Sequence, residues 1–265
     1  MCTTCGCDDD AGPRYTRLTA HAADHVHGHD HADPHEHAAG PRTVVLEQRV
    51  LGRNDDLAAR NRRELSESGV VVINLMSSPG SGKTTLLERT IRELSPRQVV
   101  SVLEGDQETV VDARRVRAAG APVVQVNTGA GCHLDAGMLR RGLAELDPPA
   151  GSLVFVENVG NLVCPALFDL GETSRVVVMS VTEGNDKPIK YPHMFRTADL
   201  VLINKTDLLP YVDFDPVRCA DQVHGLNPAA EILPLSATRG DGLAEWFRWL
   251  AARGPGGENR SILDS

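Results

Sequence analysis

The segment NLMSSPGSGKTTLL has the residue types of a phosphate-binding loop between a strand and a helix. Gly80 and Gly82 allow the backbone to turn so that successive N–H groups point into the loop. Lys83 supplies a charge for the β- and γ-phosphates, and Thr84 supplies a hydroxyl for Mg²⁺. The strict pattern G-x-x-x-x-G-K-[ST] requires glycine where this chain has Ser77, but the flanking strand and helix favour a nucleotide site over an incidental glycine-rich turn. The predicted phosphate contacts are Gly80, Ser81, Gly82, Lys83, Thr84 and Thr85.

Two further motifs indicate the base. The segment VLINKTDLLP ends a predicted strand with the N-K-x-D pattern Asn204, Lys205 and Asp207. The Asp207 carboxylate would accept two hydrogen bonds from N1–H and N2–H₂ of guanine, whereas adenine would leave it unpaired. Downstream, LPLSATRGDG places Ser236 and Ala237 as in the GTPase segment whose alanine N–H meets the guanine O6. The two motifs in this order predict GTP rather than ATP.

Carboxylates that could hold Mg²⁺ follow two other predicted strands. GTPases usually carry D-x-x-G, whose aspartate holds Mg²⁺ through water and whose glycine senses the γ-phosphate, and here VFVENVGN offers Glu157 and Gly160. The segment VLEGDQET offers Glu104 and Asp106, of which we favour Asp106 as a second Mg²⁺-side or water-positioning group. No water-orienting glutamine or arginine finger is evident, which predicts intrinsic GTP hydrolysis slower than about 1 s⁻¹. The predicted catalytic residues are Lys83, Asp106 and Glu157, with Thr84, Asp106 and Glu157 around Mg²⁺.

A second kind of chemistry is indicated by cysteine and histidine. The segment VNTGAGCHLDAG carries Cys132 and His133, and GNLVCPALFD carries Cys164 shortly after the Glu157 motif. Two thiolates and an imidazole suit Zn²⁺ or Ni²⁺. The alternative is that the cysteines are small buried hydrophobes and the histidine caps a helix. The position of Cys164, just beyond the expected γ-phosphate sensor, favours the metal site, whereas Cys219 is predicted to be structural.

The N-terminus carries further metal-ligand types. It begins MCTTCGCDDD, with thiols at Cys2, Cys5 and Cys7, and seven histidines are interspersed with acidic residues between positions 21 and 37. Three thiolates on a chain end suit a square-planar Ni²⁺ site better than a catalytic disulfide. Because this composition cannot fill a core, we expect residues 1–42 to be disordered. The thiols would then be insulated from the nucleotide by a long flexible tether.

The rest of the chain alternates strand and helix patterns. Apolar runs without polar alternation indicate parallel strands buried on both faces, and amphipathic segments such as KTTLLERTIREL lie between them. The predicted fold is an α/β, P-loop GTPase-like three-layer fold with a mostly parallel sheet. The predicted strands are 70–76, 98–103, 122–126, 152–157, 175–181, 200–204 and 231–235, with a charged helix before them from about residue 44 to 68. The predicted domains are a Cys/His-rich metal-binding tail (1–42), a GTPase domain with an embedded metal site (43–254) and a mobile C-terminal tail (255–265).

Composition excludes several partners and compartments. The 265 residues carry a formal net charge of −9, which argues against nucleic acid as a partner. No apolar run approaches the ~20 residues of a membrane-spanning helix, and the N-terminus has no apolar signal segment. Thiols at C-x-x-C spacing are typical of metal or redox sites in a reducing compartment, so we expect a cytoplasmic protein.

Six segments, in order, resemble the HypB family of hydrogenase nickel-incorporation GTPases: NLMSSPGSGKTTLLE, EGDQET, NTGAGCHLDA, ENVGNLVCPALFDLGE, TEGNDKPIKYPHMF and NKTDLLPY. The resemblance covers about residues 44–250, and family members with an N-terminal C-x-x-C-G-C or a His-rich segment match the start of this chain. It implies a GTPase that dimerises on GTP and takes part in delivering Ni²⁺ to the [NiFe]-hydrogenase large subunit together with the nickel chaperone HypA. It also implies a Ni²⁺ or Zn²⁺ site at Cys132, His133 and Cys164 and a tight Ni²⁺ site at Cys2, Cys5 and Cys7.

Together these features predict that GTP and Mg²⁺ favour the dimer and move Cys164 relative to Cys132 and His133, so that metal affinity depends on the nucleotide. Three alternatives remain open. One is the urease nickel-insertion GTPase, although its metal motif is Cys-Pro-His and this chain has Gly131 before Cys132 and His133. The others are a nickel storage protein with an accessory GTPase and a GTPase with a purely structural zinc.

Overall fold

The computed structural model describes residues 14–17, 41–106, 111–129 and 131–254. The N-terminal thiols, the seven interspersed histidines and the predicted C-terminal tail lie outside the described residues. No helix in the described ranges is both long and apolar enough to span a bilayer.

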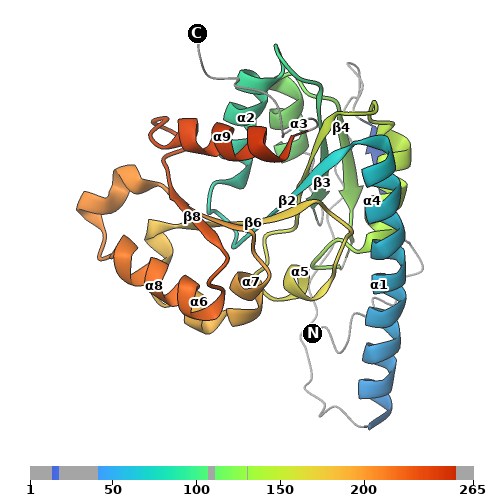
Figure 1. The fold of residues 1–265 in the computed structure, drawn as a ribbon, viewed down its shortest axis with the longest axis horizontal. Helices are drawn as coiled ribbons and strands as arrows, with labels where there is room; N and C mark the ends of the chain where they lie inside the picture. The colour runs from blue at the N-terminus through green and yellow to red at the C-terminus, as the bar shows by residue number, and fades with distance from the viewer. Residues whose placement is uncertain (1–13, 18–40, 107–110, 130, 255–265) are drawn as a thin grey trace, which may run out of the picture.

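Within these residues the core is an eight-stranded sheet in the order β1-β4-β3-β5-β2-β6-β7-β8 (Figure 1). Adjacent strands from β4 to β8 pair in parallel, and only β1 runs antiparallel to its neighbour β4. This confirms the predicted α/β fold with a mostly parallel sheet, and each of the seven predicted strands is present with ends shifted by no more than three residues. The strands are β1 (Arg14–Arg17), β2 (Val71–Ser77), β3 (Val100–Asp106), β4 (Val123–Asn127), β5 (Leu153–Glu157), β6 (Ser174–Ser180), β7 (Leu200–Asn204) and β8 (Glu231–Pro234).

Helices cover both faces of the sheet and make it a three-layer structure (Figure 1). One face packs against α2, α3 and α9, where Trp246 and Phe155 are among the largest buried side chains. The other face packs against α1 and α4 at one end and α5, α7 and α8 at the other. The helices are α1 (Pro41–Ser68), α2 (Lys83–Leu94), α3 (Val111–Ala118), α4 (Ala136–Leu146), α5 (Cys164–Leu167), α6 (Lys187–Lys190), α7 (Pro192–Arg196), α8 (Pro216–Leu226) and α9 (Leu243–Arg253), with short 3₁₀ helices at Val181–Glu183 and Thr206–Tyr211.

The central strands are mostly apolar and show no alternation of polar and apolar residues because both of their faces are covered. Every residue of β2 is buried. Val71 and Ile73 point into the cluster under α2 and α9, whereas Val72 points into the cluster under α1 and α4. A strand placed this way has no solvent-facing side, so polar residues do not alternate along it.

The short strand β1 corrects the prediction that all of residues 1–42 are disordered, which is wrong for Arg14–Arg17. Arg14 lies opposite Asn127 and Arg17 opposite Val124 on the edge strand β4. The Tyr15 hydroxyl accepts a hydrogen bond from Arg141 Nε at 2.7 Å, and the Arg141 guanidinium lies over the Tyr15 ring. Pairing with the edge of β4 and the contacts with Arg141 of α4 stabilise this segment, which is too short to form a hydrophobic core by itself.

The carboxyl ends of β2, β3, β4, β5 and β7 meet at one edge of the sheet (Figure 1). This is the edge at which α/β proteins bind ligands. The predicted nucleotide and Cys132/His133/Cys164 motifs follow these strand ends or, for Ser236 and Ala237, the end of the parallel strand β8, so the fold brings them into one region.

Candidate nucleotide and metal sites

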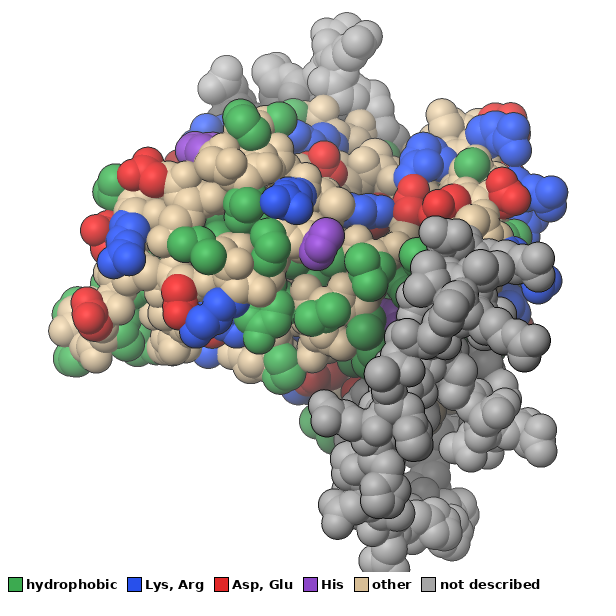
Figure 2. Space-filling view, turned by 90° about the horizontal axis from the view of Figure 1, so that it is seen from below, with side chains coloured by type: hydrophobic (Ala, Val, Ile, Leu, Met, Phe, Trp, Pro, Cys, Tyr) green, Lys and Arg blue, Asp and Glu red, His purple; other side chains and the backbone are tan. Residues whose placement is uncertain are grey.

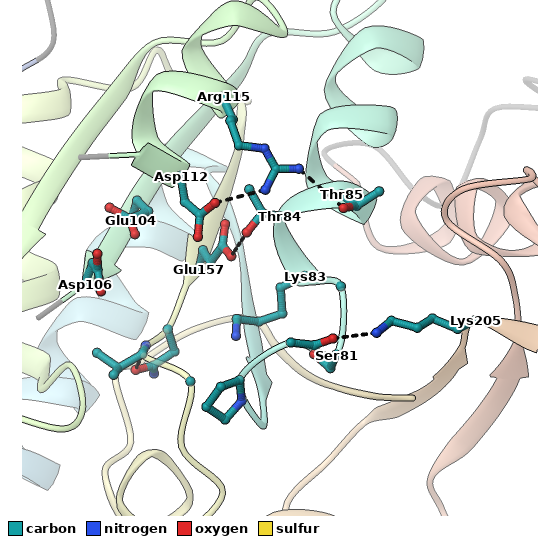
Figure 3. A pocket seen from close by; sticks show the side chains of 17 residues that line it. Ser81, Lys83, Thr84, Thr85, Glu104, Asp106, Asp112, Arg115, Glu157 and Lys205 are labelled. Carbon is teal, nitrogen blue, oxygen red and sulfur yellow. Dashed lines mark hydrogen bonds and ion pairs between the residues drawn. The ribbon is translucent and has the colours of Figure 1, made fainter. Parts of the chain in front are cut away.

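A pocket of about 490 Å³ opens at this edge, between the loop after β2, the ends of β3 and β5, and the first turn of α3 (Figure 3). It contains the predicted phosphate-binding, Mg²⁺-binding and catalytic residues together. Those of the predicted residues that line it are Gly80, Ser81, Gly82, Lys83, Thr84, Thr85, Asp106, Glu157, Gly160 and Lys205.

The loop after β2 has the geometry of a phosphate-binding loop. Gly82 has φ +99°, and a Cβ there would lie 2.5 Å from Asn204 Nδ2, so conformation and space both require glycine. Lys83 Nζ donates to Ser77 Oγ at 2.6 Å. Burial lowers the pKa of Lys83, partly offset by Glu157 and other carboxylates around it. Ser77, which departs from the strict motif, therefore has a role as an acceptor for the loop lysine.

The oxygen atoms around Thr84 suit a hard cation. Thr84 Oγ1 donates to Glu157 Oε1 at 2.7 Å, and Glu104 lies opposite Glu157 in the pairing of β3 with β5. Glu157 Oε2 and Glu104 Oε2 are buried, and neither has a hydrogen-bond partner among the described residues. Mg²⁺ prefers hydroxyl, carboxylate and water oxygens, so this donor set fits the ion, with Asp106 on the same wall of the pocket (Figure 3).

The predicted guanine-binding residues form a hydrogen-bonded unit beside the pocket. Asn204 Nδ2 donates to the Ser81 carbonyl at 2.9 Å, and Asn204 Oδ1 accepts from the Ala237 N–H at 3.0 Å. Ser236 Oγ donates to Asp207 Oδ1 at 2.6 Å. The Ala237 N–H is thus bonded to Asn204 in this structure, and its contact with guanine O6 stays a prediction. Asn204 joins the phosphate loop to the segment that carries Ala237.

Lys205 is the member of this group that lines the pocket, and its Nζ donates to the Gly80 carbonyl at 2.7 Å (Figure 3). It adopts φ +63°, a left-handed conformation that is uncommon for a residue with a side chain. The Asn204 and Lys205 side chains thus both bond carbonyl groups of the phosphate loop.

Cys132, His133 and Cys164 form a cluster, as predicted. Their ligand atoms all lie within 4.8 Å of one another, and the Cys132 and Cys164 sulfur atoms are 2.8 Å apart. Ligand atoms of a single ion with bonds of about 2.3 Å lie up to about 4.6 Å apart, which is close to the 4.8 Å span of the cluster, whereas the two sulfur atoms are closer together than two metal-bound thiolates would be. The His133 ring stacks on Phe168 with centroids 4.0 Å apart, and burial lowers its pKa, which favours the neutral imidazole that binds metals. The donor set fits Ni²⁺ or Zn²⁺.

Comparison with known proteins identifies the family. The model of the CobW/HypB/UreG nucleotide-binding domain matches residues 71–234. Hydrogenase maturation factor HypB of Azotobacter vinelandii is 55% identical over 209 residues, which span 79% of this chain and 69% of that protein. The chain belongs to the HypB family. HypB of Escherichia coli K12 is 53% identical over 209 residues, 79% of this chain and 72% of that protein.

Two solved HypB structures share the fold. HypB from Archaeoglobus fulgidus has a TM-score of 0.71 at 42% identity and covers 76% of this chain and 98% of its own. HypB from Helicobacter pylori in complex with nickel has a TM-score of 0.71 at 35% identity and covers 80% of this chain and 100% of its own. The family resemblance read from the six sequence segments is therefore confirmed.

Two charged pocket residues of this HypB family member were not predicted from the sequence. Asp112 and Arg115, on α3, line the pocket (Figure 3). Arg115 forms ion pairs with Asp112 at 3.0 Å and Glu88 at 2.9 Å, and its Nη2 donates to Thr85 Oγ1 at 3.4 Å. The signal available was the i,i+3 spacing of an acid and a base on one helix face. Only the packing of α3 beside α2 places that pair next to the phosphate loop.

Glu104 gives the protein a pH-dependent stability. Burial, reinforced by the negative charge of Glu157, raises the pKa of Glu104 from 4.5 to about 9. Between about pH 5 and 9 the folded protein thus keeps a proton that the unfolded chain releases, so stability falls as pH rises, by up to about 1.4 kcal/mol per pH unit. We expect Glu104→Gln, measured by urea unfolding without nucleotide or Mg²⁺, to be less pH-dependent than the parent and more stable at about pH 8.

The matched control is Glu145→Gln, because Glu145 is exposed on α4. This variant should keep the parental pH slope. An unchanged slope in Glu104→Gln would show that Glu104 is ionised in the folded protein.

Proposed function

We propose that this HypB family member is a GTP-hydrolysing nickel metallochaperone for [NiFe]-hydrogenase maturation. Its reaction is GTP + H₂O → GDP + phosphate, and Ni²⁺ is its cargo. The observation that carries the proposal is that one segment serves both sites. It begins with Glu157 and Gly160 in the nucleotide pocket and reaches Cys164 in the metal cluster seven residues after Glu157. The nickel complex of the Helicobacter pylori relative supports the choice of metal.

Each group has a role in this proposal. Lys83 and the N–H groups of the phosphate loop bind the β- and γ-phosphates, and Asp207 with Asn204 selects guanine. Thr84, Glu157 and Asp106 would hold Mg²⁺, which when bound neutralises phosphate charge during phosphoryl transfer. Arg115 is ion-paired to Glu88 and Asp112, which agrees with slow intrinsic hydrolysis because this arginine is held by carboxylates and does not serve as an arginine finger.

We further propose that GTP promotes a homodimer through the face that carries the metal cluster. Val163, Leu167 and Ile189 on and beside α5 and α6 are 52%, 47% and 62% exposed. Figure 2 shows hydrophobic side chains gathered over the middle of the face seen from below. An apolar patch beside the segment that joins Glu157 to Cys164 suits a partner that binds in one nucleotide state. The proposed partners beyond the dimer are the nickel chaperone HypA and the hydrogenase large-subunit precursor, in the cytoplasm.

The proposed tail of residues 1–42 contains strand β1, which belongs to the sheet of the GTPase domain. Residues 43–254 form the GTPase domain with its metal site, and Cys2, Cys5 and Cys7 form a second nickel site, but β1 belongs to the sheet. Removing residues 1–42 would therefore also remove a strand. A test of the metal cluster should instead use the whole chain with Cys2, Cys5 and Cys7 changed to Ser and the seven histidines between positions 21 and 37 changed to Gln, called here the tail-silent protein.

The test is a titration of the tail-silent protein with Ni²⁺ and with Zn²⁺, in the presence of GDP or a non-hydrolysable GTP analogue. We expect one metal site per chain, with an affinity that differs between the two nucleotides by about 5-fold or more. Equal affinities in the two nucleotide states would refute nucleotide control of the metal. Metal that binds only to the unmodified tail would indicate a nickel storage protein instead.

A further inference from the structure

Asn158 lines the nucleotide pocket and is hydrogen-bonded to the residue that follows the metal cluster residue His133 in the chain. It lines the pocket directly after Glu157 and is 2% exposed. Its Oδ1 accepts hydrogen bonds from the backbone N–H of Leu134 at 3.2 Å and of Val159 at 2.9 Å. Leu134 directly follows the metal-cluster residue His133. One buried side chain therefore joins the backbones of the two segments that form the two sites.

Hydrogen bonds to buried residues hold the Asn158 side chain in one orientation. Its Nδ2 donates to Asn74 Oδ1 at 3.4 Å, and Asn74 Nδ2 donates to Glu172 Oε1 at 3.1 Å. Both partners are buried. A shift of Asn158 relative to this network or to Leu134 would leave buried polar groups unpaired, which is costly. A movement of the segment after β5 that shifts Asn158 would therefore break its bond to the Leu134 N–H unless the Leu134 backbone moves with it.

The same segment is held tightly at the nucleotide end. A Cβ on Gly160 would lie 3.2 Å from atoms of Pro79 in the phosphate loop, so the two backbones are in close contact. At the metal end, Asn161 Nδ2 donates to the Cys132 carbonyl at 3.5 Å, and Cys164 begins α5. A γ-phosphate arriving beside Gly160 acts on a segment that is already bonded to both sides of the metal cluster.

We propose that Asn158 is the positioning residue that couples the nucleotide state to metal affinity, through its hydrogen bond to the Leu134 N–H. This inference rests on the proposed function. When the Glu157–Gly160 segment shifts toward the γ-phosphate, Asn158 carries the shift into the Cys132–Leu134 loop and changes its position relative to Cys164. By linkage, nickel binding changes the affinity for GTP relative to GDP by the same factor.

The test compares tail-silent protein with and without Asn158→Ala, measuring Ni²⁺ affinity with GDP and with the GTP analogue. We expect the ratio of the two affinities, about 5-fold or more in the parent, to fall to within about 2-fold of one in the variant. Asn127→Ala is the matched control, because Asn127 also bonds a loop backbone N–H, that of Gly129 at 2.8 Å, and does not reach the segment after β5. It should keep the parental ratio.

The outcomes separate this inference from the proposed function. If the parent ratio is already one, the proposed nucleotide control fails and the inference fails with it. If the parent ratio is large and Asn158→Ala retains it, the inference alone is overturned.

A second measurement needs no variant. The Leu134 amide is expected to exchange its hydrogen at rates that differ at least about 3-fold between the GDP-bound and analogue-bound protein, since its acceptor moves with the nucleotide. Backbone NMR resolves that single amide. Identical exchange rates at Leu134 in the two states would overturn the inference even if Asn158→Ala does not fold.

Discussion

Asp207→Asn is expected to lower the affinity for GTP and GDP by at least about 100-fold, because two charge-assisted hydrogen bonds to guanine are lost or weakened. Ser236 Oγ holds the Asp207 carboxylate at 2.6 Å, so the side chain is already oriented for the base. The same variant should gain affinity for xanthine nucleotides, in which a carbonyl replaces the 2-amino group and can accept from the new amide. Fluorescence titration with labelled GDP and XDP measures both effects.

The control for this prediction is Asp213→Asn, an exposed aspartate of the same region that lies outside the N-K-x-D motif. It should leave both affinities unchanged. If Asp207→Asn bound GDP as tightly as the parent protein, Asp207 would not be the guanine ligand, and the preference for GTP over ATP would need another source.

The central strands and the phosphate loop could be predicted because the signals for them are local. Strand β2 is mostly apolar and shows no polar alternation, since both of its faces are covered. The phosphate loop follows it directly, and its glycines and lysine act through backbone that is close in sequence. The Cys132, His133 and Cys164 cluster was also predicted, because each member follows a strand whose carboxyl end lies at the same edge of the sheet.

Features that depend on contacts distant in sequence were missed. Strand β1 has four residues and no hydrophobic pattern, and it exists because the edge of β4 and the side chain of Arg141 are available to it. Arg115 reaches the nucleotide pocket only because α3 packs beside α2. The bond between Ala237 and Asn204 likewise depends on the alignment of two strand ends.

The position of β1 shortens the expected tether between the tail thiols and the GTPase domain. Six residues separate Cys7 from Arg14, so Cys7 lies at most ~25 Å from Arg14 even when that stretch is fully extended. Arg14 is paired with Asn127, five residues before Cys132. The stretch that joins Cys7 to the described structure is therefore six residues long, and the independence of the tail thiols from the nucleotide stays a prediction.

Removing one thiol of the metal cluster should abolish its metal binding and leave the fold intact. In tail-silent protein, Cys132→Ser and Cys164→Ser are each expected to lower Ni²⁺ affinity by about 100-fold or more, since even the loss of an outer partner of a ligand costs 10- to 100-fold. Both cysteines are only half-buried and lie outside the three hydrophobic clusters. Metal titration measures the affinity, and thermal unfolding of the metal-free proteins measures the stability.

Cys219→Ala provides the opposite control. Cys219 is fully buried against Met179, and burial raises the pKa of its thiol to about 11, so it is a core residue and no metal ligand. Its truncation should reduce stability by about 1 kcal/mol and leave Ni²⁺ affinity unchanged. A purely structural zinc would reverse this pattern, because Cys132→Ser would then unfold the domain. Loss of metal with retained stability in Cys132→Ser, set against loss of stability with retained metal in Cys219→Ala, would separate a cargo site from a structural one.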